Sequence, residues 1–202
     1  MATARKPFYT PEQYLENERQ AEFRSEYIAG EIFAMAGASR RHNIITLNVA
    51  SLLGTQIGDS CEAYANDMRI QVKPTGMYTY PDVVIVCGER KFLDAAEDTL
   101  LNPTVIVEIL SPSTASYDRV EKFAHYRRLA SLREYVLVSQ DRPCIERYER
   151  TGDSDTEWLY TIAEGAAATL LLPTIGSTLA LADVYRKITF ADASDGDRPT
   201  PD

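Results

Sequence analysis

The fold is decided by two short stretches, Tyr80-Pro81-Asp82-Val83-Val84-Ile85-Val86 and Val105-Ile106-Val107-Glu108-Ile109-Leu110. Each stretch is rich in β-branched apolar residues and carries one carboxylate, a pattern that predicts a buried strand. A buried carboxylate is costly unless a positive group lies against it, and two carboxylates on neighbouring strands repel each other. We therefore expect Asp82 and Glu108 to depend on a cation, such as a divalent metal ion.

The length and composition are those of one globular domain with a polar tail. The chain has 202 residues, of which 45% are hydrophobic and 25% are charged, so we expect a single domain over residues 1–190. Residues 191–202 are polar and contain proline, which predicts a disordered tail. No apolar stretch is long enough to span a membrane, and the N-terminus lacks the apolar core of a signal peptide. We therefore expect a cytoplasmic protein that does not associate with a membrane.

The three cysteines, Cys61, Cys87 and Cys144, are scattered without the CxxC spacing of a zinc site. An odd number of dispersed cysteines is typical of unpaired thiols in a reducing cytoplasm. We expect Cys87, at the end of a strand, to be a small core residue.

The formal net charge of −9 disfavours a protein that binds nucleic acid through many phosphate contacts, because such proteins usually carry a basic face. Any basic surface must therefore be local. The best candidates are Arg119, Lys122, Arg127, Arg128 and Arg133.

The elements around the two strands predict an α/β fold, in which helices flank a mixed β-sheet and an antiparallel β extension follows at the C-terminal end. The stretch from strand 104–110 through a helix to strand 134–139 predicts a right-handed crossover. Helices are expected from Thr10 to about Arg19, from Ser39 to about Gly58, and from Ser113 to near Leu132. The other predicted strands are a pair within 23–36, then 61–65, 68–72, 144–150, 157–162 and 168–172.

The third helix carries a candidate lysine. Asp118, Lys122 and His125 recur at spacings of four and three and therefore share one side of the helix. Val120, Phe123 and Ala124 lie on the other side and are expected to meet the sheet or another helix. Without the strand carboxylates, Asp118 and Lys122 would be interpreted as an ordinary surface ion pair.

Three motifs resemble those of the Uma2-type endonucleases: Tyr80-Pro-Asp-Val-Val, Val107-Glu-Ile-Leu-Ser-Pro-Ser-Thr and Tyr117-Asp-Arg-Val-Glu-Lys-Phe-Ala-His-Tyr. The resemblance implies the restriction-endonuclease-like fold of the PD-(D/E)xK superfamily. It also implies a metal-dependent endonuclease in which Asp82 and Glu108 hold Mg²⁺, or Mn²⁺ in its place, and Lys122 completes the catalytic set. Leu110 occupies the position two after Glu108 where the superfamily expects lysine, which makes Lys122 the replacement.

Four further residues are candidates for supporting roles, each beside a simpler interpretation. Glu31 is either a third acid near the metal or a solvent-facing strand residue. His42 either caps a helix or lies near the site, His125 either contacts phosphate or is merely exposed, and Tyr126 either packs or takes part in function. By analogy with enzymes that cut both DNA strands, the resemblance also implies a homodimer acting on DNA.

Two other functions fit the same residues. One is a catalytically idle module that binds nucleic acid or serves in assembly, which the acidic charge and the displaced lysine favour. The other is a small-molecule hydrolase that uses the same carboxylates and metal.

Overall fold

The computed structural model describes residues 7–152 and 154–190. A six-stranded sheet forms its centre, in the order β11-β10-β9-β8-β6-β3. Neighbouring strands are antiparallel except for the parallel pair β8 and β9. The six strands are β3 (Cys61–Ala65), β6 (Val83–Cys87), β8 (Val105–Leu110), β9 (Glu134–Ser139), β10 (Cys144–Arg150) and β11 (Trp158–Glu164).

The inner strands β6, β8 and β9 are buried on both faces, which explains why β6 and, apart from Glu108, β8 are continuously apolar. Alternate side chains enter two separate cores: Val107 and Ile109 enter one, Ile106 and Leu110 the other. The first core is closed by α2 (Arg40–Gln56), α5 (Leu181–Val184) and a small antiparallel sheet. That sheet consists of β12 (Thr169–Leu172) and β13 (Ser177–Ala180), joined by the 3-10 turn Pro173–Ile175.

The second core is covered by the helical segment that joins β8 to β9 and by a five-stranded sheet. The helical segment consists of α3 (Ala115–Tyr117), a π-helical turn (Asp118–Lys122) and α4 (Phe123–Tyr126). The five-stranded sheet has the order β2-β1-β5-β4-β7. Its strands are β1 (Ser25–Ile28), β2 (Glu31–Ala34), β4 (Arg69–Val72), β5 (Met77–Thr79) and β7 (Thr99–Leu100).

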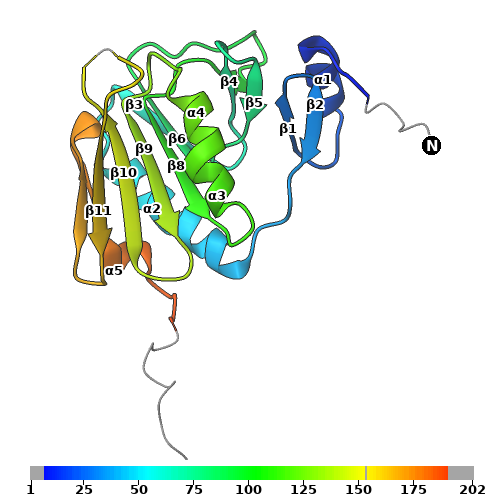
Figure 1. Ribbon diagram of the computed structural model, residues 1–202. Coiled ribbons are helices and arrows are strands. Elements are labelled where there is room, and N and C mark those ends of the chain that lie inside the picture. Colours follow the sequence, from blue (N-terminus) through cyan, green and yellow to red (C-terminus); the bar gives the residue numbers. More distant parts are fainter. Residues whose placement is uncertain (1–6, 153, 191–202) are drawn as a thin grey trace, which may run out of the picture.

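The N-terminal hairpin of β1 and β2 and the helix α1 (Pro11–Glu18) stand to one side of the central sheet (Figure 1). The Tyr14 hydroxyl donates to the Ser25 carbonyl at 2.7 Å, which fastens α1 to β1. The hairpin turns at Ala29 and Gly30, both with positive φ, as a two-residue turn between twisted strands requires. The chain then runs from β2 to α2, so the hairpin is connected directly to the helix beneath the central sheet.

The structure confirms the α/β class, the mixed sheet flanked by helices and the C-terminal antiparallel strands. The third helix, however, ends at Tyr126 rather than near Leu132. Of its predicted apolar face, Phe123 packs against the second core, but Val120 is 64% exposed, whereas Lys122 on the predicted polar side is buried. No helix within the two described ranges is long and apolar enough to cross a membrane, and the predicted tail at 191–202 lies outside those ranges.

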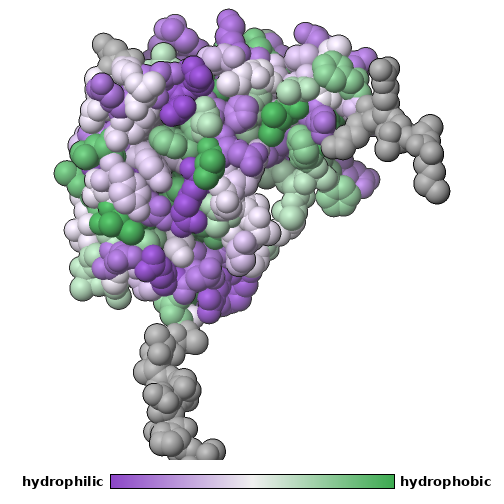
Figure 2. Space-filling model, viewed as in Figure 1, coloured by the Kyte–Doolittle hydropathy of each residue, from purple (hydrophilic) through white to green (hydrophobic). Residues whose placement is uncertain are grey.

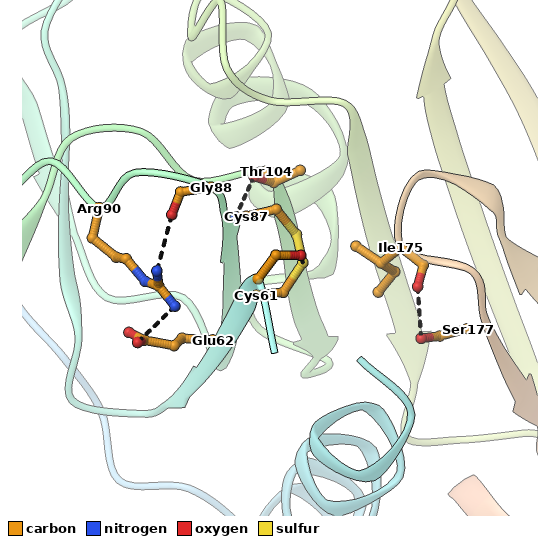
Figure 3. Close-up of a disulfide and its surroundings, with 9 residues drawn as sticks. Cys61, Glu62, Cys87, Gly88, Arg90, Thr104, Ile175 and Ser177 are labelled. Carbon is orange, nitrogen blue, oxygen red and sulfur yellow. Dashed lines mark hydrogen bonds and ion pairs between the residues drawn. A yellow bond between two sulfur atoms is a disulfide. The ribbon is translucent and has the colours of Figure 1, made fainter. Parts of the chain in front are cut away.

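The prediction of unpaired cysteines is wrong for two of the three. Cys61 and Cys87 face each other across the antiparallel pair β3 and β6 and form a disulfide (Figure 3). Cys87 is therefore a cross-strand staple, whereas Cys144 is a buried free thiol. The argument from unpaired cysteines to a reducing cytoplasm no longer holds. Twenty-five intervening residues separate the partners (87 − 61 − 1), so the sequence carries no local signal for the bond.

Candidate functional site

A cleft of about 740 Å³ lies where the β1–β2 hairpin, the start of α2 and the helical segment approach β6 and β8. Asp82, Glu108 and Lys122 all line it. The three predicted catalytic residues are therefore brought together from two neighbouring strands and the helical segment that follows the second strand.

Asp82 precedes β6 and lies across from Glu108. The register pairs Val83 with Val107, and its continuation by one residue places Asp82 opposite Glu108. The Asp82 carboxylate accepts a hydrogen bond from the Ile109 amide at 2.7 Å, and Nε2 of His42 lies 3.2 Å from its other oxygen. His42 belongs to the first turn of α2, where its amide donates to the capping hydroxyl of Ser39. His42 therefore lies at the start of a helix, as its first interpretation expected, and also lines the cleft, as its second expected.

Glu108 is only 4% exposed and is held by two donors. The Tyr126 hydroxyl donates to Oε1 at 2.7 Å, and Nζ of Lys122 donates to the same oxygen at 3.1 Å. Tyr126 packs in the second core while its hydroxyl orients the carboxylate. Tyr126 therefore packs, as one interpretation expected, and also contacts the predicted site residue Glu108.

Lys122 is 7% exposed and is surrounded by acids. Its Nζ lies 3.0 Å from Oε1 of Glu26, 3.1 Å from Oε1 of Glu108 and 3.6 Å from Oδ1 of Asp118. The interpretation of Asp118 and Lys122 as a surface ion pair is excluded, because both side chains are buried. Glu26 comes from β1 of the other sheet and also accepts from the Thr79 hydroxyl.

Asp118–Lys122 forms a π-helical turn, and the side chain of Lys122 points from this turn toward Glu108. Such turns are rare and occur frequently at functional sites. The wider turn brings residues four apart closer to one line. Asp118, Lys122 and Tyr126 consequently face inward together, whereas the predicted partner His125 does not line the cleft.

The sequence did not single out Glu26, and Glu31, for which a third acid near the metal was one of two interpretations, does not line the cleft. Glu31 pairs with Ile28 at the hairpin turn, whereas Glu26 lies between Ser25 and Tyr27 in a buried strand. The sequence before Glu26 is Arg24-Ser25, so Glu26 does not lie in the kind of continuous apolar run that identified Asp82 and Glu108.

The cluster holds more acids than cations, and burial perturbs their titration. Burial raises the pKa of Glu108 to about 8, with the Lys122 charge opposing the shift and the Asp82 and Asp118 charges adding to it. Burial likewise raises the pKa of Asp118. Burial disfavours the charge on Lys122, yet Glu108, Glu26 and Asp118 together hold the Lys122 pKa well above its ordinary value. Such perturbed groups in a cleft are typical of functional sites.

The raised pKa of Glu108 predicts how stability depends on pH. The folded protein binds a proton at Glu108 that the unfolded chain releases, so without metal its stability should fall as pH rises from about 4.5 to about 8. Glu108→Gln removes this charge and should be more stable than the parent at pH 8 by about 1–3 kcal/mol. At pH 5 the two should be nearly equal. Urea unfolding in EDTA at both pH values measures the difference.

The exposed Glu89, which lies 3.8 Å from Lys91, supplies the control. Glu89→Gln should leave the parent's pH dependence unchanged. If Glu108→Gln and the parent lose stability in parallel between pH 5 and 8, then Glu108 does not titrate in this range.

The donor set suits a hard cation. Within residues 7–152 and 154–190, no three His, Cys, Asp or Glu side chains converge closely enough to hold a metal ion by themselves. Mg²⁺ does not require that, because one or two carboxylates usually hold it while water and phosphate oxygens complete its shell. Asp82 and Glu108 supply two carboxylates in one cleft, in a cluster with an excess of negative charge. These residues therefore fit Mg²⁺ or Mn²⁺.

Comparison with known proteins also indicates a nuclease family. The Uma2 family model, described as "Putative restriction endonuclease", matches residues 11–182. Two proteins of Synechocystis sp. (strain ATCC 27184 / PCC 6803 / Kazusa) are similar over most of their length. "Uncharacterized protein sll1609" is 40% identical over 169 residues, which cover 83% of this chain and 94% of the relative. "Uncharacterized protein slr1290" is 35% identical over 185 residues, which cover 91% and 95%.

The fold also has a counterpart among solved structures. A crystal structure from Anabaena variabilis ATCC 29413, described as "a putative nuclease belonging to DUF820", superposes with a TM-score of 0.71 at 18% identity. The match covers 88% of this chain and 97% of that one. It confirms the restriction-endonuclease-like architecture that the motifs of β6, β8 and the following helical segment implied.

Proposed function

The chain belongs to the Uma2 family of putative restriction endonucleases, and from this premise we propose that it is a metal-dependent endonuclease that hydrolyses phosphodiester bonds in DNA. The observation that carries the proposal is the 3.1 Å contact between Nζ of Lys122 and Glu108, in a cleft that Asp82 also lines. Two acids and a lysine converge although the lysine comes from a position 14 residues after the second acid (122 − 108).

In this proposal each residue has a defined task. Asp82 and Glu108 would hold Mg²⁺, which would supply Lewis-acid polarisation of the phosphodiester. Lys122 places its charge beside Glu108, where it stabilises the negative charge that develops on the phosphoryl oxygens. Tyr126 and the Ile109 amide fix the orientation of the two carboxylates, so that little reorganisation is needed during the reaction.

The proposal is tested by incubating the full chain with labelled single-stranded DNA, duplex DNA and RNA, each with Mg²⁺, with Mn²⁺ and with EDTA. Internal cleavage of DNA that requires the metal supports it. Metal-dependent cleavage of RNA alone would retain a nuclease but overturn the DNA assignment. Binding without cleavage would favour the idle module, and absence of both would contradict a nucleic-acid substrate.

Metal binding should be visible as stabilisation, because an ion that binds only the folded protein raises its free energy of unfolding. At tenfold excess over its dissociation constant the gain is about 1.4 kcal/mol, which raises the Tm by roughly 3–5 °C for a chain of this size. Asp82→Asn should lose most of this increment. A thermal melt with and without 10 mM Mg²⁺ measures it, and an identical increment in parent and variant would place the bound ion elsewhere.

The proposal includes a homodimer, for which β11 is the candidate surface. β11 is an outermost strand of the central sheet and exposes Leu159, Tyr160 and Ile162. An exposed apolar edge strand favours pairing with a second copy. Sedimentation should give the mass of a dimer, and Ile162→Lys should shift it to that of a monomer. A monomeric parent would contradict this part of the proposal.

A further inference from the structure

The lining of the cleft indicates which form of nucleic acid it accepts. Resting on the proposed function, we propose that it binds a single-stranded segment, with an unstacked base against Phe33 and the sugar–phosphate chain along the hydroxyl groups of Ser111, Ser113 and Thr114. Three properties of the lining favour a single strand: its charge, its apolar segment and its neutral donors.

The cations of the lining already have partners. Among the described lining residues, the Lys and Arg side chains are Arg24, Arg41 and Lys122. Arg24 pairs with Asp67, Arg41 donates to the Thr189 carbonyl at 2.9 Å, and Lys122 is enclosed by acids. Duplex binding depends on many phosphate contacts from free cations. Arg41 keeps its charge, because a carbonyl is neutral, but one such cation in a chain of net charge −9 supplies few of these contacts, so other contacts must add to the affinity.

An apolar segment supplies one such contact. The lining includes the run from Phe33 to Ala38, at the end of β2 and on the way to α2. Phe33 is 45% exposed and Met35 39%. Figure 2 shows apolar colour on the lower side of the N-terminal hairpin, where the chain runs toward α2. An exposed aromatic ring in a cleft can stack with a base of any sequence, provided that the base is unstacked from its neighbours.

Neutral donors supply the other contact. The hydroxyl of Ser111 lies 3.0 Å from that of Ser113 and 2.9 Å from that of Thr114, and all three residues line the cleft. Hydroxyl groups are common partners of phosphate and sugar oxygens and carry no charge. They therefore fit a short stretch of one strand beside Asp82 and Glu108 without adding to the positive charge of the cleft.

The size of the cleft is consistent with a short single-stranded segment. A volume of about 740 Å³ falls within the range of pockets that enclose small ligands, which corresponds to about one or two nucleotides. A single strand can bend a nucleotide into such a space. A stacked duplex presents no free base face to Phe33.

The test measures binding by fluorescence anisotropy, using Glu108→Gln in Mg²⁺ so that cleavage does not consume the probe. The probes are a fluorescein-labelled oligothymidylate and a hairpin duplex of equal length. We expect the single strand to bind at least tenfold more tightly than the duplex. The logarithm of its binding constant should fall with the logarithm of salt concentration with a slope no steeper than about −2, which corresponds to no more than about three phosphate contacts.

Phe33→Ala, placed in the Glu108→Gln background, should weaken single-strand binding roughly tenfold, as expected for the loss of one stacked base. Phe23→Ala in the same background is the matched control, because Phe23 is 79% exposed and does not line the cleft. It should bind like Glu108→Gln. Equal or tighter duplex binding, no detectable binding of either probe, or no effect of Phe33→Ala would each overturn the inference.

Cleavage by the unmodified chain separates the two proposals. If it cuts duplex DNA and leaves the single strand intact, the single-strand inference fails while the proposed endonuclease stands. If it cuts nothing, yet single-strand binding depends on Phe33, the inference stands and the proposed hydrolysis fails.

Discussion

Replacing Lys122 with methionine should lower the rate of DNA cleavage roughly 100- to 1000-fold and destabilise the fold. The rate falls because Lys122 provides a preorganised positive charge beside Glu108, and the loss of one such contact typically costs this factor. Stability falls because Glu26, Glu108 and Asp118 lose their shared cation. Leaving buried charge without a partner costs about 3–5 kcal/mol, or roughly 6–20 °C in Tm.

A second substitution separates the catalytic role from the structural one. Glu26→Gln removes one of the three acids that contact Lys122, so the double variant Lys122→Met with Glu26→Gln should regain part of the lost Tm. Its cleavage rate should stay low, because the positive charge is still missing. Rates are compared at a temperature at which every variant is folded.

Lys91→Met is the matched control, since Lys91 is exposed and lies beside Glu89. It should change neither rate nor Tm. If the double variant cuts DNA as fast as the parent, then Lys122 only neutralises its neighbours and has no part in catalysis.

Replacing Asp82 with asparagine should lower the cleavage rate by about a thousandfold or more while leaving the fold intact. Asparagine keeps an oxygen for the Ile109 amide that now donates to Asp82 at 2.7 Å, so the position of β6 against β8 is preserved. It removes one of the two charges proposed to hold Mg²⁺. Calorimetric titration with Mn²⁺ should therefore give heat with the parent and almost none with Asp82→Asn.

Asp155→Asn controls for the general effect of losing an acid, because Asp155 pairs with Arg128 and does not line the cleft. It should bind Mn²⁺ and cut DNA like the parent. Undiminished Mn²⁺ heat in Asp82→Asn would exclude Asp82 as a metal ligand.

The sequence predicts the centre of the fold well because β6, β8 and β9 are buried on both faces. A continuous β-branched run strongly favours a buried strand. The predicted strand 134–139 accordingly agrees with the structure at both ends. The same logic identified Asp82 and Glu108, since a carboxylate in such a run stands out against its neighbours. The shortest strands, β5 of three residues and β7 of two, were missed because so few residues show no period, and β13 was missed as well.

The parts that were mispredicted depend on contacts between distant segments. Val120 was expected to face the core because it is hydrophobic. It is exposed instead, because the buried side of that helical segment is occupied by Lys122. The usual position of the lysine, two residues after Glu108, is not usable here, because Leu110 is buried in the second core and does not line the cleft. Glu26 joins the site only through the packing of one sheet against another.

The central claim is that Asp82, Glu108 and Lys122 form a metal-dependent nuclease site. The most direct measurement is the single-turnover rate at which the parent, Asp82→Asn and Asp155→Asn cut an end-labelled DNA oligonucleotide in Mg²⁺. The account predicts equal cleavage by the parent and Asp155→Asn, cleavage abolished by EDTA, and a rate at least about a thousandfold lower for Asp82→Asn. Equal rates for the parent and Asp82→Asn, or no cleavage by the parent, would contradict it.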